Sequence, residues 1–147
     1  MNNRWMLGIA MMLGSAITGA QPSCSKLQVL YDMRIIVAVD GVKTSTGAIM
    51  SREGVSGHVS ALLGPDVDKS PRFEIDAAAY EVQQASGSSA VMMKLTLSKP
   101  DSNGDMQVFA RPVVVVSEGA ISYVQVDNIS LSIWVTRNVR PAAAPAS

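Results

Sequence analysis

The stretch LQVLYDMRIIVAV, residues 27–39, decides the fold class of this chain. Every odd position of the stretch is apolar, whereas the polar side chains Gln28, Asp32 and Arg34 all stand at even positions. Successive side chains of a β-strand point to opposite faces of a sheet, so this alternation predicts a long strand with one buried face. The apolar odd positions are Leu27, Val29, Tyr31, Met33, Ile35, Val37 and Val39.

The same alternation is found in about eight segments of the chain, separated by glycine, proline or asparagine turns. Asp40-Gly41 follows the first segment and predicts a hairpin, because glycine accepts a positive φ angle without steric cost. The pattern as a whole predicts an all-β fold, either an antiparallel β-sandwich or a partly closed barrel. The other segments lie near residues 43–51, 55–63, 72–84, 91–98, 106–116, 121–126 and 129–137.

The segment DAAAYEVQQA, residues 76–85, fits two kinds of secondary structure. It continues the alternation of Phe73 and Ile75, which predicts a strand, but it could also form a short helix with Asp76 as its N-cap. The ASGSS sequence at 85–89 supplies a turn into the next strand, so we favour the strand.

The two halves of the chain resemble each other. AIMSREGVSGHVS at 48–60 aligns without a gap with VVVVSEGAISYVQ at 113–125, and this alignment places the Glu-Gly pair at 53–54 over the pair at 118–119. We therefore predict a single β-domain over residues 27–139. It would be built from two similar four-strand meanders, about 27–83 and 89–139.

The first 20 residues have the pattern of a secretory signal peptide. Arg4 precedes an apolar run from Trp5 to Ile17, and small residues lead to a predicted cleavage site after Ala20. A membrane anchor that is not cleaved is the competing interpretation, but a span needs about 20 apolar residues and this run is shorter. We expect a periplasmic or secreted protein without a membrane span after cleavage.

Two short segments flank the predicted domain. Residues 21–26 are predicted to be a flexible arm, and residues 140–147, which are rich in proline and alanine, a disordered tail. Cys24 in the arm is the only cysteine of the chain, so no internal disulfide can form. A free thiol, a lipid anchor and a disulfide to another chain all stay open for it.

The charge of the chain argues against nucleic acid as a partner. The chain has 12 basic and 12 acidic side chains, and removal of Arg4 with the signal peptide leaves 11 and 12. The basic residues are scattered singly, without aromatic residues between them. Proteins that bind nucleic acid usually carry a basic patch or stripe, which this sequence lacks.

The stretch KPDSNGD, residues 99–105, has oxygen-bearing side chains at alternate positions, as a calcium loop does. A twelve-residue calcium loop also needs glycine at its sixth position and glutamate at its twelfth. Counted from Asp101, these positions hold Met106 and Pro112. We therefore predict a hairpin turn, in which Asn103-Gly104 supplies the positive φ angle, and we predict no metal and no cofactor.

Candidates for catalysis are few. His58 is the only histidine, and its position in the alternation places it on the polar face of a strand, beside Ser56 and Ser60. No serine lies in the Gly-x-Ser-x-Gly elbow of a hydrolase. We expect a protein that is not an enzyme and has no catalytic residues, and a small secreted hydrolase with an unrecognised site is the alternative.

The function expected from these observations is binding of a protein partner, or assistance to a cell-envelope complex, by an exported β-domain. Edge strands can pair with another chain or with a second copy, and the expected edges are the strand at 27–39 and the strand that contains Pro112. PVVVV at 112–116 is apolar at every position, so Val113 and Val115 are the candidate contact residues. The alternative is that the tail or the loop at 64–71 covers them.

Overall fold

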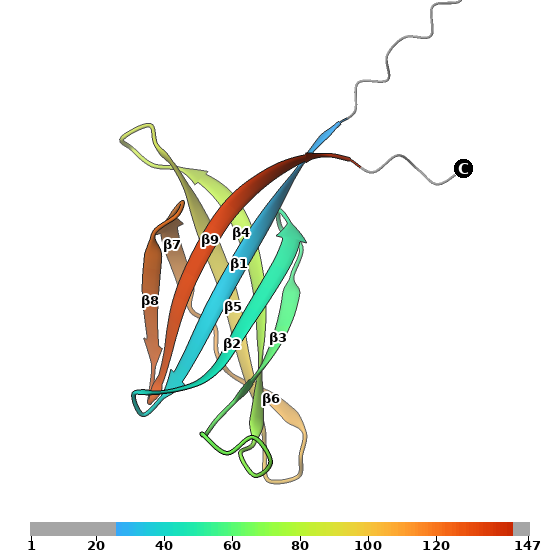
Figure 1. Ribbon diagram of the computed structural model, residues 1–147, viewed down its shortest axis with the longest axis vertical. Coiled ribbons are helices and arrows are strands. Elements are labelled where there is room, and N and C mark those ends of the chain that lie inside the picture. The colour runs from blue at the N-terminus through green and yellow to red at the C-terminus, as the bar shows by residue number, and fades with distance from the viewer. Residues whose placement is uncertain (1–25, 143–147) are drawn as a thin grey trace, which may run out of the picture.

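The computed structural model describes residues 26–142, and this part of the chain folds into two antiparallel sheets with no helix (Figure 1). The predicted all-β sandwich is confirmed, and the sheets do not close into a barrel. The strands are β1 (Leu27–Val39), β2 (Val42–Arg52), β3 (Gly57–Leu62), β4 (Arg72–Gln83), β5 (Ser89–Pro100), β6 (Met106–Ala110), β7 (Val113–Ser117), β8 (Ile121–Val126) and β9 (Ile129–Pro141).

The structure differs from the predicted strands at one place and decides between the two interpretations of another. The predicted strand at 106–116 is split into β6 and β7 at Arg111-Pro112, which gives nine strands in place of eight. Proline has no N–H to donate to a ladder, so the pairing breaks there. The strand interpretation of 76–85 is confirmed by β4, which ends at Gln83.

Several predictions concern residues outside the described part of the chain. They are the signal peptide at 1–20, the arm except for Lys26, and the tail from residue 143 on. The described end of the chain continues β9 through Arg140 and Pro141, two residues past the predicted domain boundary. These residues pair in register with Gln28 and Leu27.

Sheet A has the strand order β2-β1-β9-β8, and sheet B has the order β3-β4-β5 followed by β6 and β7, which both pair with β5. β1 pairs with β9 along its whole length, from Leu27 opposite Pro141 to Val39 opposite Ile129. The prediction that β1 is an edge strand was therefore wrong. Its local sequence could not show that the last strand of the chain returns to lie beside the first.

The two halves of the chain occupy equivalent places. β1 and β2 lie in sheet A and lead to β3 and β4 in sheet B, whereas β5 to β7 lie in sheet B and lead to β8 and β9 in sheet A. The strands β1, β2, β3 and β4 of the first half are equivalent to β5, β7, β8 and β9 of the second half. With this correspondence, sheet A in the order β2-β1-β9-β8 and sheet B in the order β7-β5-β4-β3 have the same sequence of equivalent strands. Each half thus contributes strands to both sheets, and neither half is a continuous four-strand meander as predicted, because β2 and β3 lie in different sheets and the second half has five strands.

The two Glu-Gly turns confirm this equivalence at the level of hydrogen bonds. The Gly54 N–H donates to Ala79 O at 2.9 Å, and the Gly119 N–H donates to Val135 O at 3.1 Å. Both glycines have φ angles above 70°. The carboxylate of the preceding glutamate also repeats its role, because Glu53 Oε1 accepts from the N–H of residue 81 and Glu118 Oε1 from that of residue 137.

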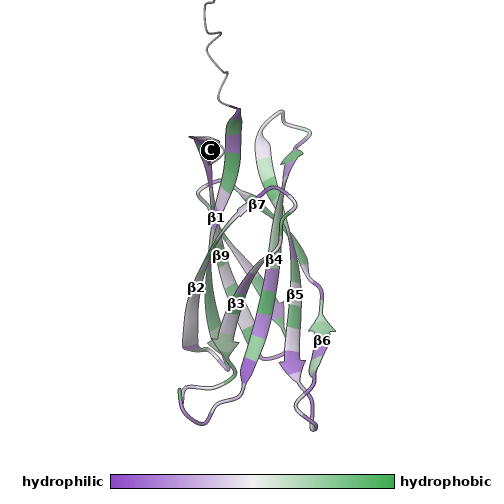
Figure 2. Cartoon of the chain, turned by 90° about the vertical axis from the view of Figure 1, so that its right-hand side faces the viewer, coloured by the Kyte–Doolittle hydropathy of each residue, from purple (hydrophilic) through white to green (hydrophobic). Residues whose placement is uncertain are grey.

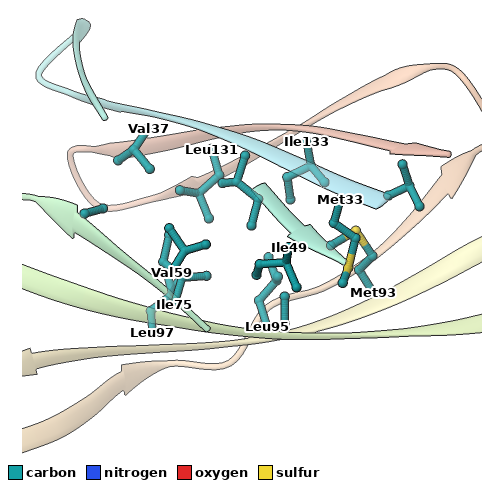
Figure 3. Close-up of a cluster of buried hydrophobic side chains, with 14 of the residues drawn as sticks. Met33, Val37, Ile49, Val59, Ile75, Met93, Leu95, Leu97, Leu131 and Ile133 are labelled. Atoms are coloured by element: carbon teal, nitrogen blue, oxygen red, sulfur yellow. The ribbon is translucent and has the colours of Figure 1, made fainter. Parts of the chain in front are cut away.

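The core lies between the inner faces of the two sheets, as Figure 3 shows. In Figure 2 the ribbon of β4 is banded purple and green, which is the alternation that turns one apolar face inward. Burying an aliphatic side chain of this kind contributes about 1.5–3 kcal/mol, so this layer supplies most of the stability. Its buried members include Met33, Val37, Ile49, Leu131 and Ile133 from sheet A, and Val59, Ile75, Met93, Leu95 and Leu97 from sheet B.

On one side of the sandwich, β2 and β3 approach each other closely because two positions lack a side chain. A Cβ atom on Gly47 would lie 2.3 Å from Val59 Cγ1, and a Cβ atom on Gly57 would lie 2.0 Å from Ile49 Cγ2. Neither distance is compatible with van der Waals contact. The two glycines are therefore required for this close approach, and we call this side the closed side.

Side chains of β2 also bond the edge of β3 on the closed side. Thr44 Oγ1 donates to Leu62 O, and Ser45 Oγ accepts from the Leu62 N–H, both at 2.9 Å. The opposite side, between β7 and β8, has different residues at the equivalent positions. The gap-free alignment places Pro112 at the position of Gly47 and Ser122 at that of Gly57.

Candidate functional site

The stretch KPDSNGD forms the predicted turn between β5 and β6. Asp101 Oδ1 accepts from the N–H groups of Asn103 at 2.8 Å and Asp105 at 3.0 Å, and its Oδ2 accepts from the Gln107 side chain at 3.0 Å. Gly104 has the positive φ angle, 87°, that such a turn needs. The carboxylate of Asp101 is thus engaged by donors within its own loop.

Asp101→Ala is expected to lower the free energy of unfolding by about 1 kcal/mol, since it removes several hydrogen bonds from an exposed turn. Asp105→Ala is the control, because the Asp105 carboxylate makes no hydrogen bond within residues 26–142, and it should change stability by less than about 0.5 kcal/mol. Urea denaturation with and without millimolar calcium measures both. Stabilisation by calcium that Asp101→Ala abolishes would show that the loop is a metal site.

His58 lies on the outer face of sheet B, directly opposite Asp76 of β4. Its Nδ1 is 2.9 Å from Asp76 Oδ1, and its Nε2 contacts the carboxylate of Glu74. The hydrogen bond to Asp76 raises the pKa of His58 above 6.5. Burial opposes this rise, and the charge of Glu74 adds to it. Both ring nitrogens are engaged by carboxylates, so the ring has no free nitrogen to take a proton from a substrate.

The His58 contacts should make stability depend on pH. Because the pKa of His58 is raised in the folded state, the unmodified chain should have a higher free energy of unfolding than His58→Gln. This difference is fully present below pH 6.5 and is lost as the pH rises through the folded-state pKa. The effect should be modest, because the side chain is more than half exposed. Urea denaturation of both proteins at about pH 5 and about pH 8 measures it. An unchanged difference between the two pH values would contradict the pairing.

A polar cluster lies at the end of the sandwich where the two Glu-Gly turns are found. Arg137 and Glu81, whose backbone N–H groups bond to the equivalent glutamates of the two halves, form an ion pair at 3.5 Å. The Tyr31 hydroxyl is buried beneath them and has no hydrogen-bond partner within the described residues. Burial, followed by the charges of Glu53 and Glu81, raises the pKa of Tyr31 above 10, so the hydroxyl stays neutral.

Val113 and Val115 both lie on the outer face of β7, with 59% and 50% of their surface exposed. The loop at 64–71 therefore does not cover them. In register, Val115 is opposite Met92 and Val113 is opposite Lys94, and the Lys94 ammonium lies 5.0 Å from the centre of the Tyr80 ring. We call Tyr80, Met92, Val113 and Val115 the sheet B patch.

A second apolar surface, which the sequence did not reveal, lies on the outer face of sheet A. Ile121 is opposite Trp134 and Tyr123 is opposite Ser132, while Ile36 of β1 is opposite Ser132 on its other side. Residues directly opposite on neighbouring strands share a face of the sheet. These exposed side chains therefore form one surface across β1, β9 and β8. We call Ile36, Ile121, Tyr123 and Trp134 the sheet A patch.

A shallow hollow of about 270 Å³ lies within the sheet A patch. It is lined by the patch residues Ile36, Ile121 and Trp134, together with Arg34, Thr46, Ser132 and Ile133. The Arg34 guanidinium lies 5.4 Å from the centre of the Trp134 ring, a distance at which a cation is attracted to an aromatic face. The hollow thus combines an apolar floor with one positive charge held on its rim.

The sequence did contain a sign of this surface. Ile36 and Trp134 stand at even positions of strands whose odd positions fill the core, so each is an apolar residue on an outward face. Single exposed apolar residues are common and need no explanation. The patch becomes evident only when β1, β8 and β9 are known to be neighbours.

Two general features of residues 26–142 bear on function. No helix in this range is long and apolar enough to cross a membrane. Within the same range, no three side chains from histidine, cysteine, aspartate and glutamate are grouped in a way that could hold a metal ion. Comparisons with protein-family models, with curated proteins and with solved structures found no significant match to this chain.

Proposed function

We propose that this chain is an exported, non-catalytic β-sandwich domain that binds a protein partner, or assists a cell-envelope complex, through the sheet A patch. The observation that carries the proposal is the gathering of Trp134, Tyr123, Ile121 and Ile36 on one face with Arg34 among them. Tryptophan, tyrosine and arginine are the residues that most often dominate the binding energy of protein interfaces.

The size of the hollow favours a protein over a small molecule. Sites for drug-sized ligands are clefts of roughly 300–1,000 Å³ that bury most of the ligand. The hollow of about 270 Å³ is smaller than this range, and the exposed side chains extend beyond it to Tyr123 on the edge strand. A side chain of a partner can enter such a hollow while the surrounding apolar surface contacts the rest of the partner.

Export is the second part of the proposal, and it rests on the pattern of residues 1–20. Intact-mass analysis of the chain from culture medium or periplasm tests it, and the expected mass is that of a chain beginning at Gln21. A mass that includes residues 1–20 would contradict cleavage. A diacylglycerol adduct on Cys24 would show a lipoprotein instead.

The binding surface can be tested with two matched lysine substitutions. Ile121 and Val113 are 58% and 59% exposed, and both lie on edge strands. A photoreactive amino acid at Ile36 would first identify the partner in cells that make the chain. With that partner purified, Ile121→Lys is expected to weaken binding at least about tenfold, because it places a charge in the apolar patch. Val113→Lys should bind as the unmodified chain does.

The opposite result is equally informative. Loss of binding in Val113→Lys alone would assign the interface to the sheet B patch, and unchanged binding in both variants would reject both patches. A measurable activity that His58→Ala abolishes would show that the protein is an enzyme.

A further inference from the structure

We infer that the free edge of β8 pairs antiparallel with β8 of a second copy of this chain, with Tyr123 opposite Tyr123 of that copy. This goes beyond the proposed function, because it uses the backbone edge of sheet A, with Tyr123 as the patch residue that lies at this edge. The strand that pairs with this edge belongs to another copy of this chain and not to a different protein.

The hydrogen-bond pattern of the β8–β9 hairpin shows which backbone groups of β8 are free. Val126 and Ile129 flank its two-residue turn, and such flanking residues bond to each other. Bonded pairs then alternate along an antiparallel ladder, so Ser122 and Val124 also bond to β9. The Gly119 N–H, which donates to Val135 O, continues the same alternation.

The N–H and C=O groups of Ile121, Tyr123 and Gln125 consequently point away from β9. Among the strands of residues 26–142, β8 pairs with β9 alone. In the same range no further backbone hydrogen bond joins these three residues to another segment. The three residues are exposed, Tyr123 by 75%. Figure 1 shows β8 as the outermost strand on its side of sheet A.

These free groups are spaced to fit a copy of themselves. An antiparallel pair centred on Tyr123 places Tyr123 opposite its counterpart and Ile121 opposite Gln125, and every backbone group used is one that β9 leaves free. A pair centred on Ser122 or Val124 would use only two of these three residues in each copy, because the partner of the third would lie outside β8. The central register also brings two tyrosine rings opposite each other, an arrangement that stabilises neighbouring strands.

β8 lacks the features that normally protect an edge strand. Charged side chains, proline and bulges keep edges from pairing with other chains, and ISYVQV has no charge, no proline and no register shift. A two-fold pairing faces a strand with itself, so any charge near its centre would repel its own copy. The absence of charge in β8 therefore suits pairing with a second copy in particular.

The other edges have such features. β3 carries His58 between two carboxylates, and the Leu62 backbone at its end is bonded by side chains of β2. β2 packs against β3 through Gly47 and Gly57 on the closed side. β6 and β7 are interrupted at Arg111-Pro112. Among the described strands, β8 is thus the edge best suited to accept another strand.

Substitution of Tyr123 by residues of opposite charge tests the pairing on the purified chain alone, without any partner protein. Sedimentation velocity should show the unmodified chain at twice the mass of one copy at about 10–100 μM. Tyr123→Lys and Tyr123→Glu should each be monomeric, with a dimer Kd raised at least about tenfold, because like charges then lie opposite each other. An equimolar mixture of the two variants should form a dimer that contains one copy of each.

Val113→Lys is the control, since it adds a lysine to the edge strand of sheet B and should leave the dimer intact. A monomeric unmodified chain, or a dimer that survives Tyr123→Lys, would overturn the inference. A mixture of the two variants that stays monomeric would overturn it as well, because the residues at 123 would then not face each other. None of these results depends on whether Ile121→Lys weakens binding of a different protein, so the two proposals can fail separately.

Discussion

Ile35→Ala is expected to lower the free energy of unfolding by about 3–4 kcal/mol, since it leaves a cavity in a closely packed core. Ile35 is completely buried between the two sheets, whereas the adjacent Ile36 is 40% exposed on the outer face of sheet A. Ile36→Ala is therefore the matched control and should cost less than about 1 kcal/mol. Urea denaturation of the two variants measures both values.

A larger effect of Ile36→Ala than of Ile35→Ala would mean that the strand is shifted by one residue, because a shift of one exchanges the two faces of a strand. Equal effects would contradict the burial of one face of β1. Ile36→Ala also separates stability from function. It removes a side chain of the sheet A patch from a folded protein, so it should weaken partner binding without unfolding the domain.

Gly57→Ala is expected to destabilise the fold by about 1–3 kcal/mol, the usual cost of overpacking a core. The added Cβ would lie 2.0 Å from Ile49 Cγ2, and isoleucine is branched at Cβ and cannot easily rotate away. In the absence of this contact, alanine would stabilise a strand relative to glycine by about 0.5–1 kcal/mol. Thermal or urea denaturation shows whether Gly57→Ala lowers or raises the free energy of unfolding.

Two further variants attribute the effect to this contact. Gly57→Ala in an Ile49→Ala background should cost at least about 1 kcal/mol less than it does alone, since residues in contact are energetically coupled. Ser122→Ala changes the equivalent position of the second half, where a Cβ is already present, and should be nearly neutral. Additive effects of the first pair would show that β2 and β3 are not in close contact.

Much of the fold could be predicted because residues that are close together in the sequence determine the turns and the buried faces of the strands. Asp40 and Gly41 both have positive φ angles in the predicted hairpin, and the alternation of odd and even positions separates core from surface along β1. The two Glu-Gly turns could be matched from a gap-free alignment, and their hydrogen bonds are indeed equivalent. Proline at 112 correctly indicated strands at the edge of a sheet.

The neighbours of each strand could not be predicted in the same way. Pairing of Leu27 with Pro141 joins the two ends of the domain, and no local pattern records such a contact. For this reason β1 was expected at an edge, and Ile36, Ile121 and Trp134 were not recognised as one surface. Val113 and Val115 were found because their pattern lies within a single strand.

The pairing of β1 with β9 also sets the order in which the domain can close. A chain made or delivered from its N-terminus, at about 5–20 residues per second during synthesis, can form the β1–β2 hairpin early. The other edge of β1 and its apolar face have no partner until β9 is available. Contacts so distant in sequence slow folding, typically to milliseconds or seconds in all-β domains. Throughout that interval the nascent chain exposes the apolar face of β1, which makes this the stage at which a holding chaperone would matter most.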